Sequence, residues 1–172
     1  MISSRHLGST LFALLLTGCG AINYVPSEYE ITTDRIQKFD ISGTVTVENK
    51  QPDTTKTIVL SAPARDWVSD NHTVTEHLAA QLRRELAKHG NIINKTSDKS
   101  IGVKVTKQQA NMYAFHMTGS LEVWITLGVA ESFPINIDQG SPGNVWRVLN
   151  GNIALGVIEI LSDKRVLAYL AQ

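Results

Sequence analysis

Four residues near the N-terminus, Leu16-Thr17-Gly18-Cys19, carry the strongest chemical signal in the sequence. Cys19 is the only cysteine, so its thiol has no partner in the chain for a disulfide. Arg5 supplies positive charge, and the apolar run at 7–16 has the ~7–15 residues of a secretory signal, which is too short to span a bilayer. An oxidising compartment disfavours an unpaired thiol, so the sequence predicts that the Cys19 sulfur is covalently modified after export.

This stretch resembles a lipobox, the site cut by the lipoprotein signal peptidase, with an aliphatic Leu16, small residues at Thr17 and Gly18, and then the cysteine. The resemblance implies cleavage between Gly18 and Cys19, a diacylglyceryl group on the thiol and an acylated amino group. Each buried methylene contributes about 0.8 kcal/mol, so two or three chains, such as palmitate, form a stable membrane anchor. Gly20 stands where an Asp would retain a Gram-negative lipoprotein in the inner membrane, which implies lipid anchoring in the outer membrane, facing the periplasm. The alternative is an ordinary secreted protein with an unmodified thiol.

Composition and charge favour a single domain after the export signal. Of the 172 residues, 42% are hydrophobic, and 16 Lys and Arg balance 16 Asp and Glu. A nucleic-acid-binding protein normally carries a basic face, whereas the basic residues here are scattered among acidic ones, so no nucleic-acid partner is expected. We expect a signal peptide at 1–18, a lipidated tether at 19–39 that docks partly on the domain, and one periplasmic α+β domain at 40–172.

The spacing of apolar residues predicts the elements of this domain. Alternation predicts strands at 41–48, 56–62, 101–105, 113–127 and, more weakly, 131–140. Helical spacing predicts helices at 74–89, 141–161 and 163–170. The first two strands should form a hairpin. The predicted fold class is α+β, a mostly antiparallel sheet of about four to five strands with two main helices packed on one face and a short C-terminal helix.

The first helix carries two specific expectations. Thr73-Val74-Thr75-Glu76 has the spacing of a capping box, which predicts that Thr73 begins the helix. Leu78, Leu82 and Leu86 recur every four residues, so they should form the face that packs on the sheet.

No set of residues has the spacing of a catalytic or metal centre. The sequence contains no G-x-S-x-G, P-loop or G-x-G-x-x-G motif. The histidines of the mature chain lack metal-ligand spacing: His72, His77, His89 and His116. An acid pair could form in space among four carboxylates, although a solvated surface explains them more simply: Glu122, Glu131, Asp138 and Glu159. We expect a non-enzymatic protein with no catalytic, cofactor-binding or metal-binding residues.

Three tryptophans are candidates for contact with a partner, because aromatic residues are enriched at interfaces. Trp124 lies on the polar face of the strand at 113–127, and Trp67 and Trp146 precede or begin the two main helices. The alternative is that they cover the ends of the core. Asn150 and Asn152, beside small residues in the second helix, would permit another element to approach closely.

The C-terminal third carries three stretches with a recognisable pattern: Val148-Leu149-Asn150-Gly151-Asn152-Ile153-Ala154, Ile158-Glu159-Ile160-Leu161-Ser162-Asp163, and the apolar residues from Val166 to Leu170. In these stretches the sequence resembles the YajG-type family of uncharacterised bacterial lipoproteins. It implies an outer-membrane lipoprotein and adds no site residue beyond Cys19.

Together these observations predict a lipid-anchored protein that contacts the membrane through Cys19 and binds another envelope protein without catalysing a reaction. The alternative is a small binding module for a lipid or glycan, acting as an accessory subunit in transport.

Overall fold

Two β-sheets organise the protein in a computed structural model that describes residues 20–92, 97–130 and 132–172. The strands are β1 (Ile22–Asn23), β2 (Thr44–Asn49), β3 (Thr57–Leu60), β4 (Trp67–Ser69), β5 (Asn91–Ile92), β6 (Lys99–Met112), β7 (Met117–Leu127) and β8 (Phe133–Ser141). Within the described residues, a five-stranded sheet has the order β5-β2-β6-β7-β8, and a three-stranded sheet has the order β1-β4-β3.

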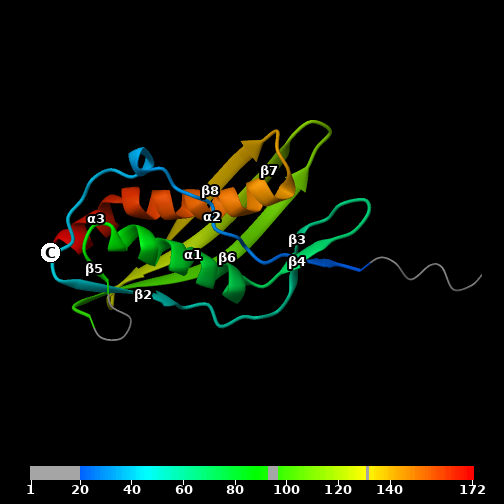
Figure 1. Cartoon of the computed structure of the whole chain (residues 1–172). Helices are drawn as coiled ribbons and strands as arrows, with labels where there is room; N and C mark the ends of the chain where they lie inside the picture. The colour runs from blue at the N-terminus through cyan, green and yellow to red at the C-terminus, as the bar shows by residue number, and fades with distance from the viewer. Residues whose placement is uncertain (1–19, 93–96, 131) are drawn as a thin grey trace, which may run out of the picture.

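The helices cover one face of the larger sheet. They are α1 (Asn71–Ala87), α2 (Val145–Ser162) and α3 (Lys164–Ala171), with a short 3-10 turn, η1, at Thr33–Arg35. Figure 1 shows α1 and α2 side by side over the long strands, with the small sheet at one end of the molecule. The core between these layers contains fully buried side chains from both, including Leu82, Val123 and Val157. The predicted α+β class with helices on one face is confirmed.

The larger sheet is mixed. β6, β7 and β8 are antiparallel neighbours, whereas β2 runs parallel to both β5 and β6. Parallel neighbours need a crossover connection, and here the chain passes through β3, β4 and α1 before it returns to the sheet in β5 and then in β6.

The predicted hairpin between the strands at 41–48 and 56–62 is wrong. β2 pairs in the larger sheet, while β3 pairs antiparallel with β4 in the smaller one. Alternation shows which side chains face a core, and Val45 and Val47 are buried as expected, but it carries no information on the pairing partner. The register of β3 shifts between Ile58 and Leu60, so Val59 is buried and Ile58 is exposed.

The single long strand predicted at 113–127 is also wrong at its start. β6 reaches Met112, the chain turns at 113–116, and β7 begins at Met117. The Tyr113 N–H donates to the His116 carbonyl oxygen at 2.9 Å and closes this turn. From Met117 onward the alternation holds, because every second residue to Leu127 is buried. Trp124 lies on the opposite, more exposed face, as predicted.

Helix α1 begins earlier than the capping box predicts. Asp70 is its N-cap, and its carboxylate oxygen accepts a hydrogen bond from the Thr73 N–H at 2.7 Å. Glu76 instead forms an ion pair with Arg83 at 2.9 Å. The apolar stripe is confirmed, since Leu78, Leu82 and Leu86 are fully buried.

Helix α2 begins at Val145 rather than near Pro142, because the Asn144 side chain caps it by accepting from the Arg147 N–H at 3.0 Å. The helix lies very close to β7 at Gly119. A Cβ at Gly119 would meet Val148 and lie 2.7 Å from Asn152 Nδ2, so only glycine fits there.

Candidate functional site

The segment at 20–39 is fixed to the domain by the short strand β1 and by individual side-chain contacts. β1 pairs parallel to β4, with the Ile22 N–H donating to the Asp66 carbonyl oxygen at 2.8 Å. Further along, Gln81 of α1 donates to the Tyr29 carbonyl oxygen at 2.7 Å, and Arg84 of α1 pairs with Glu28 at 2.9 Å. The segment therefore crosses from the small sheet over both main helices.

Asn150 on α2 holds this segment at its centre. Its Oδ1 accepts from the Tyr24 hydroxyl at 2.7 Å and from the Ser27 N–H at 3.1 Å, and its Nδ2 donates to the Ser27 hydroxyl at 2.7 Å. These residues are more than 120 positions apart in sequence. The close approach expected at Asn150 is therefore made by the N-terminal segment of the same chain.

Tyr24 is fully buried in this contact. Burial raises the pKa of its phenol well above the usual value, and a hydrogen bond with the Gln108 side chain opposes this shift only in part. The phenol is therefore neutral at physiological pH, and its hydroxyl donates a hydrogen bond to Asn150 Oδ1. The Trp146 ring lies 5.6 Å from the Tyr24 ring and 4.8 Å from the Trp67 ring. Two of the candidate tryptophans therefore pack at the small apolar cluster that contains Tyr24 and Leu149.

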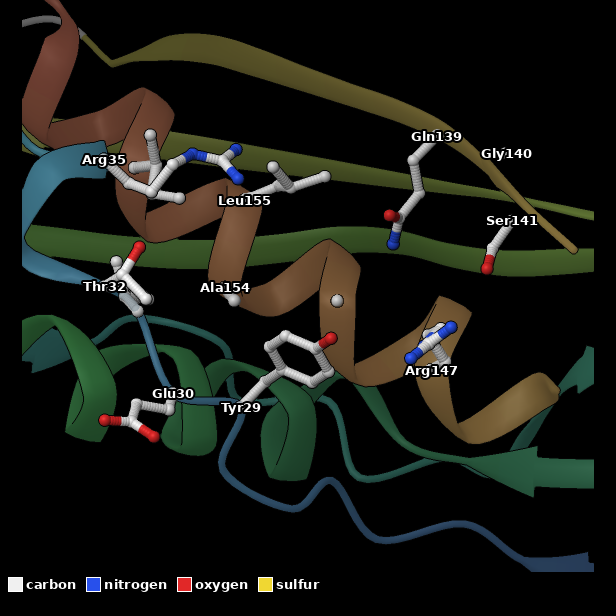
Figure 2. A pocket seen from close by; sticks show the side chains of 13 residues that line it. Tyr29, Glu30, Thr32, Arg35, Gln139, Gly140, Ser141, Arg147, Ala154 and Leu155 are labelled. Carbon is white, nitrogen blue, oxygen red and sulfur yellow. The ribbon is translucent and has the colours of Figure 1, made fainter. Parts of the chain in front are cut away.

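A groove of about 400 Å³ opens between the N-terminal segment, α2 and the end of β8. Its lining comes from three separate parts of the chain: residues 29–32 and Arg35, residues 139–141, and the α2 residues Arg147, Gly151, Ala154, Leu155 and Ile158. Figure 2 shows Arg35 and Arg147 at opposite ends of the groove, with Tyr29 between them. We take this groove as the candidate functional site.

The groove combines an apolar floor with an arginine at each end, and Glu30 adds one carboxylate to its lining. Ala154, Leu155 and Ile158 supply aliphatic surface, and Arg35 and Arg147 are exposed to solvent. Neither guanidinium forms an ion pair with any residue of 20–92, 97–130 or 132–172. An amphipathic partner with acidic groups would satisfy both features, since Arg binds carboxylate and phosphate groups in a bidentate manner.

Gly18 and Cys19, the predicted cleavage and lipidation residues, lie outside the described residues. Gly20 is exposed, and two residues after it the chain enters β1. Cleavage and acylation at Cys19 therefore stay predictions from the sequence.

The histidines do not gather in space. His72 Nδ1 lies 2.6 Å from the Gln51 carbonyl oxygen, His89 stacks on Phe39, and His116 stacks on Tyr113. In the part of the chain that the structure describes, no three His, Cys, Asp or Glu residues are placed to hold a metal ion.

Glu122, one of the four candidate acids, lies on the more exposed face of β7, where its carboxylate accepts hydrogen bonds from two neighbouring side chains. The Thr106 hydroxyl and Trp124 Nε1 both donate to its Oε1, at 2.5 and 3.0 Å. The Thr106 hydrogen bond, followed by that of Trp124, lowers the pKa of the Glu122 carboxyl, so the group is ionised at neutral pH and is a poor general acid. Glu131 lies outside the described residues.

Helix α2 is the one helix among the described residues that is long and apolar enough to cross a membrane, and 61% of it is buried inside the protein. Such burial is typical of a core helix, and the groove and Asn150 contacts above use the same helix.

These elements define an α+β domain in which helices cover one face of a mixed sheet. Its fold is similar to the crystal structure of protein XCC0632 from Xanthomonas campestris, described with the family model DUF330, with a TM-score of 0.52 and 11% sequence identity over 87% of this chain and 95% of that chain. A second crystal structure, described as an uncharacterized protein, has a TM-score of 0.45 and 13% identity over 83% of this chain and 95% of that chain. The sequence itself matches no family model and no curated protein.

At this identity the likeness to the Xanthomonas protein is one of fold. The YajG-type assignment therefore stays a prediction from the sequence.

Proposed function

We propose that this chain is a lipoprotein, anchored through acylated Cys19 to the periplasmic side of the outer membrane, whose domain binds another envelope component without catalysing a reaction. The observation that carries the proposal is the Leu16-Thr17-Gly18-Cys19 motif, in which the sole thiol stands where a lipobox requires it. Gly20 in the next position supports the outer-membrane address.

The groove is the surface at which we place this binding. It is exposed, and it combines Tyr29 with two arginines around an aliphatic floor. Aromatic residues and Arg are the types enriched in protein interfaces, so a protein segment with an apolar side chain flanked by acids fits the groove best.

Replacing Tyr29 with the photoreactive residue benzoylphenylalanine tests this assignment in intact cells. The Tyr29 side chain is 42% exposed, so a photoreactive ring there reaches a bound partner without disturbing the core. We expect irradiation to give a discrete adduct whose mass exceeds that of the chain by the mass of a second protein. The same residue at Val129, which is fully exposed at the turn after β7, serves as control. Absence of an adduct at position 29, or equal adducts at both positions, would contradict the assignment.

A second candidate function is the binding of a lipid or glycan as an accessory subunit in transport. The observation that favours it is the size and polarity of the groove. Its volume of about 400 Å³ lies within the range of small-molecule pockets, and two arginines flank its apolar floor. An amphipathic anion matches this arrangement, and in the photochemical experiment it would give an adduct of only a few hundred daltons.

Charge reversal at Arg147 tests this second candidate. We expect Arg147→Glu to weaken binding of the anionic fluorescent amphiphile 11-(dansylamino)undecanoate roughly tenfold, because a like charge then faces the carboxylate. Binding is measured by the rise in dansyl fluorescence on titration with protein. Lys104→Glu makes the same charge change on an exposed position of β6, away from the groove, and should leave the affinity unchanged. Equal affinities for both variants would exclude the groove as the amphiphile site.

A further inference from the structure

The domain begins almost directly after the anchoring residue. Only Gly20 and Ala21 separate Cys19 from β1, and β1 is fixed by the hydrogen bonds of the Ile22 N–H to Asp66 and of the Tyr24 N–H to Val68, each 2.8 Å long. Three residues span at most about 10 Å when fully extended. If Cys19 is acylated, as the proposed function requires, the lipid surface therefore lies next to the end of the molecule that carries the small sheet.

The same end carries the most exposed apolar side chains of the β6–β7 hairpin. At its tip Met112 is 51% exposed, Tyr113 52% and Phe115 92%. Figure 1 shows this tip and the β3–β4 connection extending from the same end of the molecule. From 108 to 121 the sequence contains no Asp, Glu, Lys or Arg, so no fixed charge opposes transfer of the tip out of water.

The hairpin tip and the start of the described chain each line a cavity together with part of the β3–β4 hairpin. One is lined by Leu60 and Trp67, at the ends of β3 and β4, together with residues 112–117. The other is lined by Ala21 and by the connection at 62–66 that joins these two strands. Trp67 also pairs with Ile22 of β1, so the tip and the segment that leads to the anchor both lie against the same residue of β4.

We infer that the hairpin tip, comprising Met112, Tyr113 and Phe115, enters the interfacial region of the membrane to which Cys19 is anchored. Apolar and aromatic side chains gain free energy from this transfer, and amphipathic rings such as that of Tyr113 favour the depth of the lipid headgroups. The inference rests on the proposed function, because the anchor is what brings this end of the domain to lipid. The contact fixes the orientation of the domain, with the end that carries β5 and α3 directed away from the bilayer.

The inference is tested with the full lipidated protein carrying Phe115→Cys, labelled with an environment-sensitive nitrobenzoxadiazole probe. Because the acylated Cys19 thiol does not react, the new thiol is the only labelling site. The protein is reconstituted into phosphatidylethanolamine and phosphatidylglycerol vesicles with or without nitroxide-labelled lipids. Val129→Cys is the matched control, since Val129 is fully exposed and follows the far end of β7, an 11-residue strand of about 35 Å.

We expect the probe at 115 to shift to shorter emission wavelengths on vesicles and to lose fluorescence to nitroxide lipids, while the probe at 129 does neither. An acylated, vesicle-bound protein whose two probes behave alike overturns the inference and leaves the anchor intact. A probe at 115 that is shielded in native envelopes but not on pure lipid vesicles also overturns it, since the contact is then with another protein. A protein without acyl mass that does not bind vesicles overturns both the inference and the proposed function.

Discussion

Replacing Cys19 with alanine is expected to abolish both the removal of residues 1–18 and the attachment of the protein to the membrane. If the motif is a lipobox, the Cys19 thiol accepts the diacylglyceryl group, and the chain has no other cysteine that could replace it. Two or three acyl chains contribute about 0.8 kcal/mol for each buried methylene, so their loss removes essentially all stable anchoring. Intact mass of the purified protein and flotation of cell envelopes on a density gradient measure the two losses separately.

Gly20→Asp is the matched control, because it should change the membrane to which the protein is sorted without removing the lipid anchor. The variant should keep the acyl mass but move from the outer-membrane to the inner-membrane fraction, according to the sorting rule that an Asp after the cysteine retains a lipoprotein. A Cβ at Gly20 meets no atom within 4 Å, so the substitution is expected to leave the fold unchanged. If the wild-type chain and Cys19→Ala differ in mass only by the sulfur atom of the cysteine, and both fractionate as soluble proteins, the lipoprotein proposal is wrong.

Local periodicity was sufficient to predict which residues of β6, β7 and α1 enter the core. Val103 and Val105 on β6, and Val123 and Ile125 on β7, are fully buried at the alternating positions that the sequence indicates. The leucine stripe of α1 follows the helical period in the same way. Burial on one face of an element leaves a pattern within that element, and this pattern is readable from the sequence alone.

Pairing and turns were not predictable in this way. The partners of β2 are β5 and β6, which follow it by more than 40 residues, and alternation within a strand is the same for either partner. The hairpin turn at 113–116 has the sequence Tyr-Ala-Phe-His, without the Gly, Pro, Asn or Asp that normally mark a turn. The alternation of Tyr113 and Phe115 with their neighbours therefore continued the pattern of the strand through the turn.

The candidate groove had no signal in the sequence. Arg35, Gln139 and Arg147 line it from three segments that meet only through the fold. The segment at 20–39 showed no period because it is held by separate contacts with β4, α2 and α1. The sequence predicts a tether that docks partly on the domain, and in the structure this segment supplies three buried side chains, Tyr24, Ile31 and Ile36.

Tyr24→Ala is expected to destabilise the protein by about 3–5 kcal/mol, the cost typical of deleting a large buried aromatic side chain. The ring is fully buried beside Trp146, and its hydroxyl is one of the two donors to Asn150 Oδ1. Urea denaturation measures the loss in the free energy of unfolding. Exposure of the segment to trypsin at Arg35 and Lys38 reports whether it has left the domain.

Tyr24→Phe separates packing from hydrogen bonding in this contact. It keeps the ring and removes only the hydroxyl, so it should cost about 1 kcal/mol, because Asn150 Oδ1 still accepts from the Ser27 N–H. Equal losses for the two variants would show that the ring contributes little and that the described packing is wrong. Loss of the Tyr24 contact should also weaken the proposed membrane contact. Once the segment at 20–39 has left the domain, up to 20 residues separate the anchor from the domain instead of two. The hairpin tip at Phe115 is then no longer held at the lipid surface.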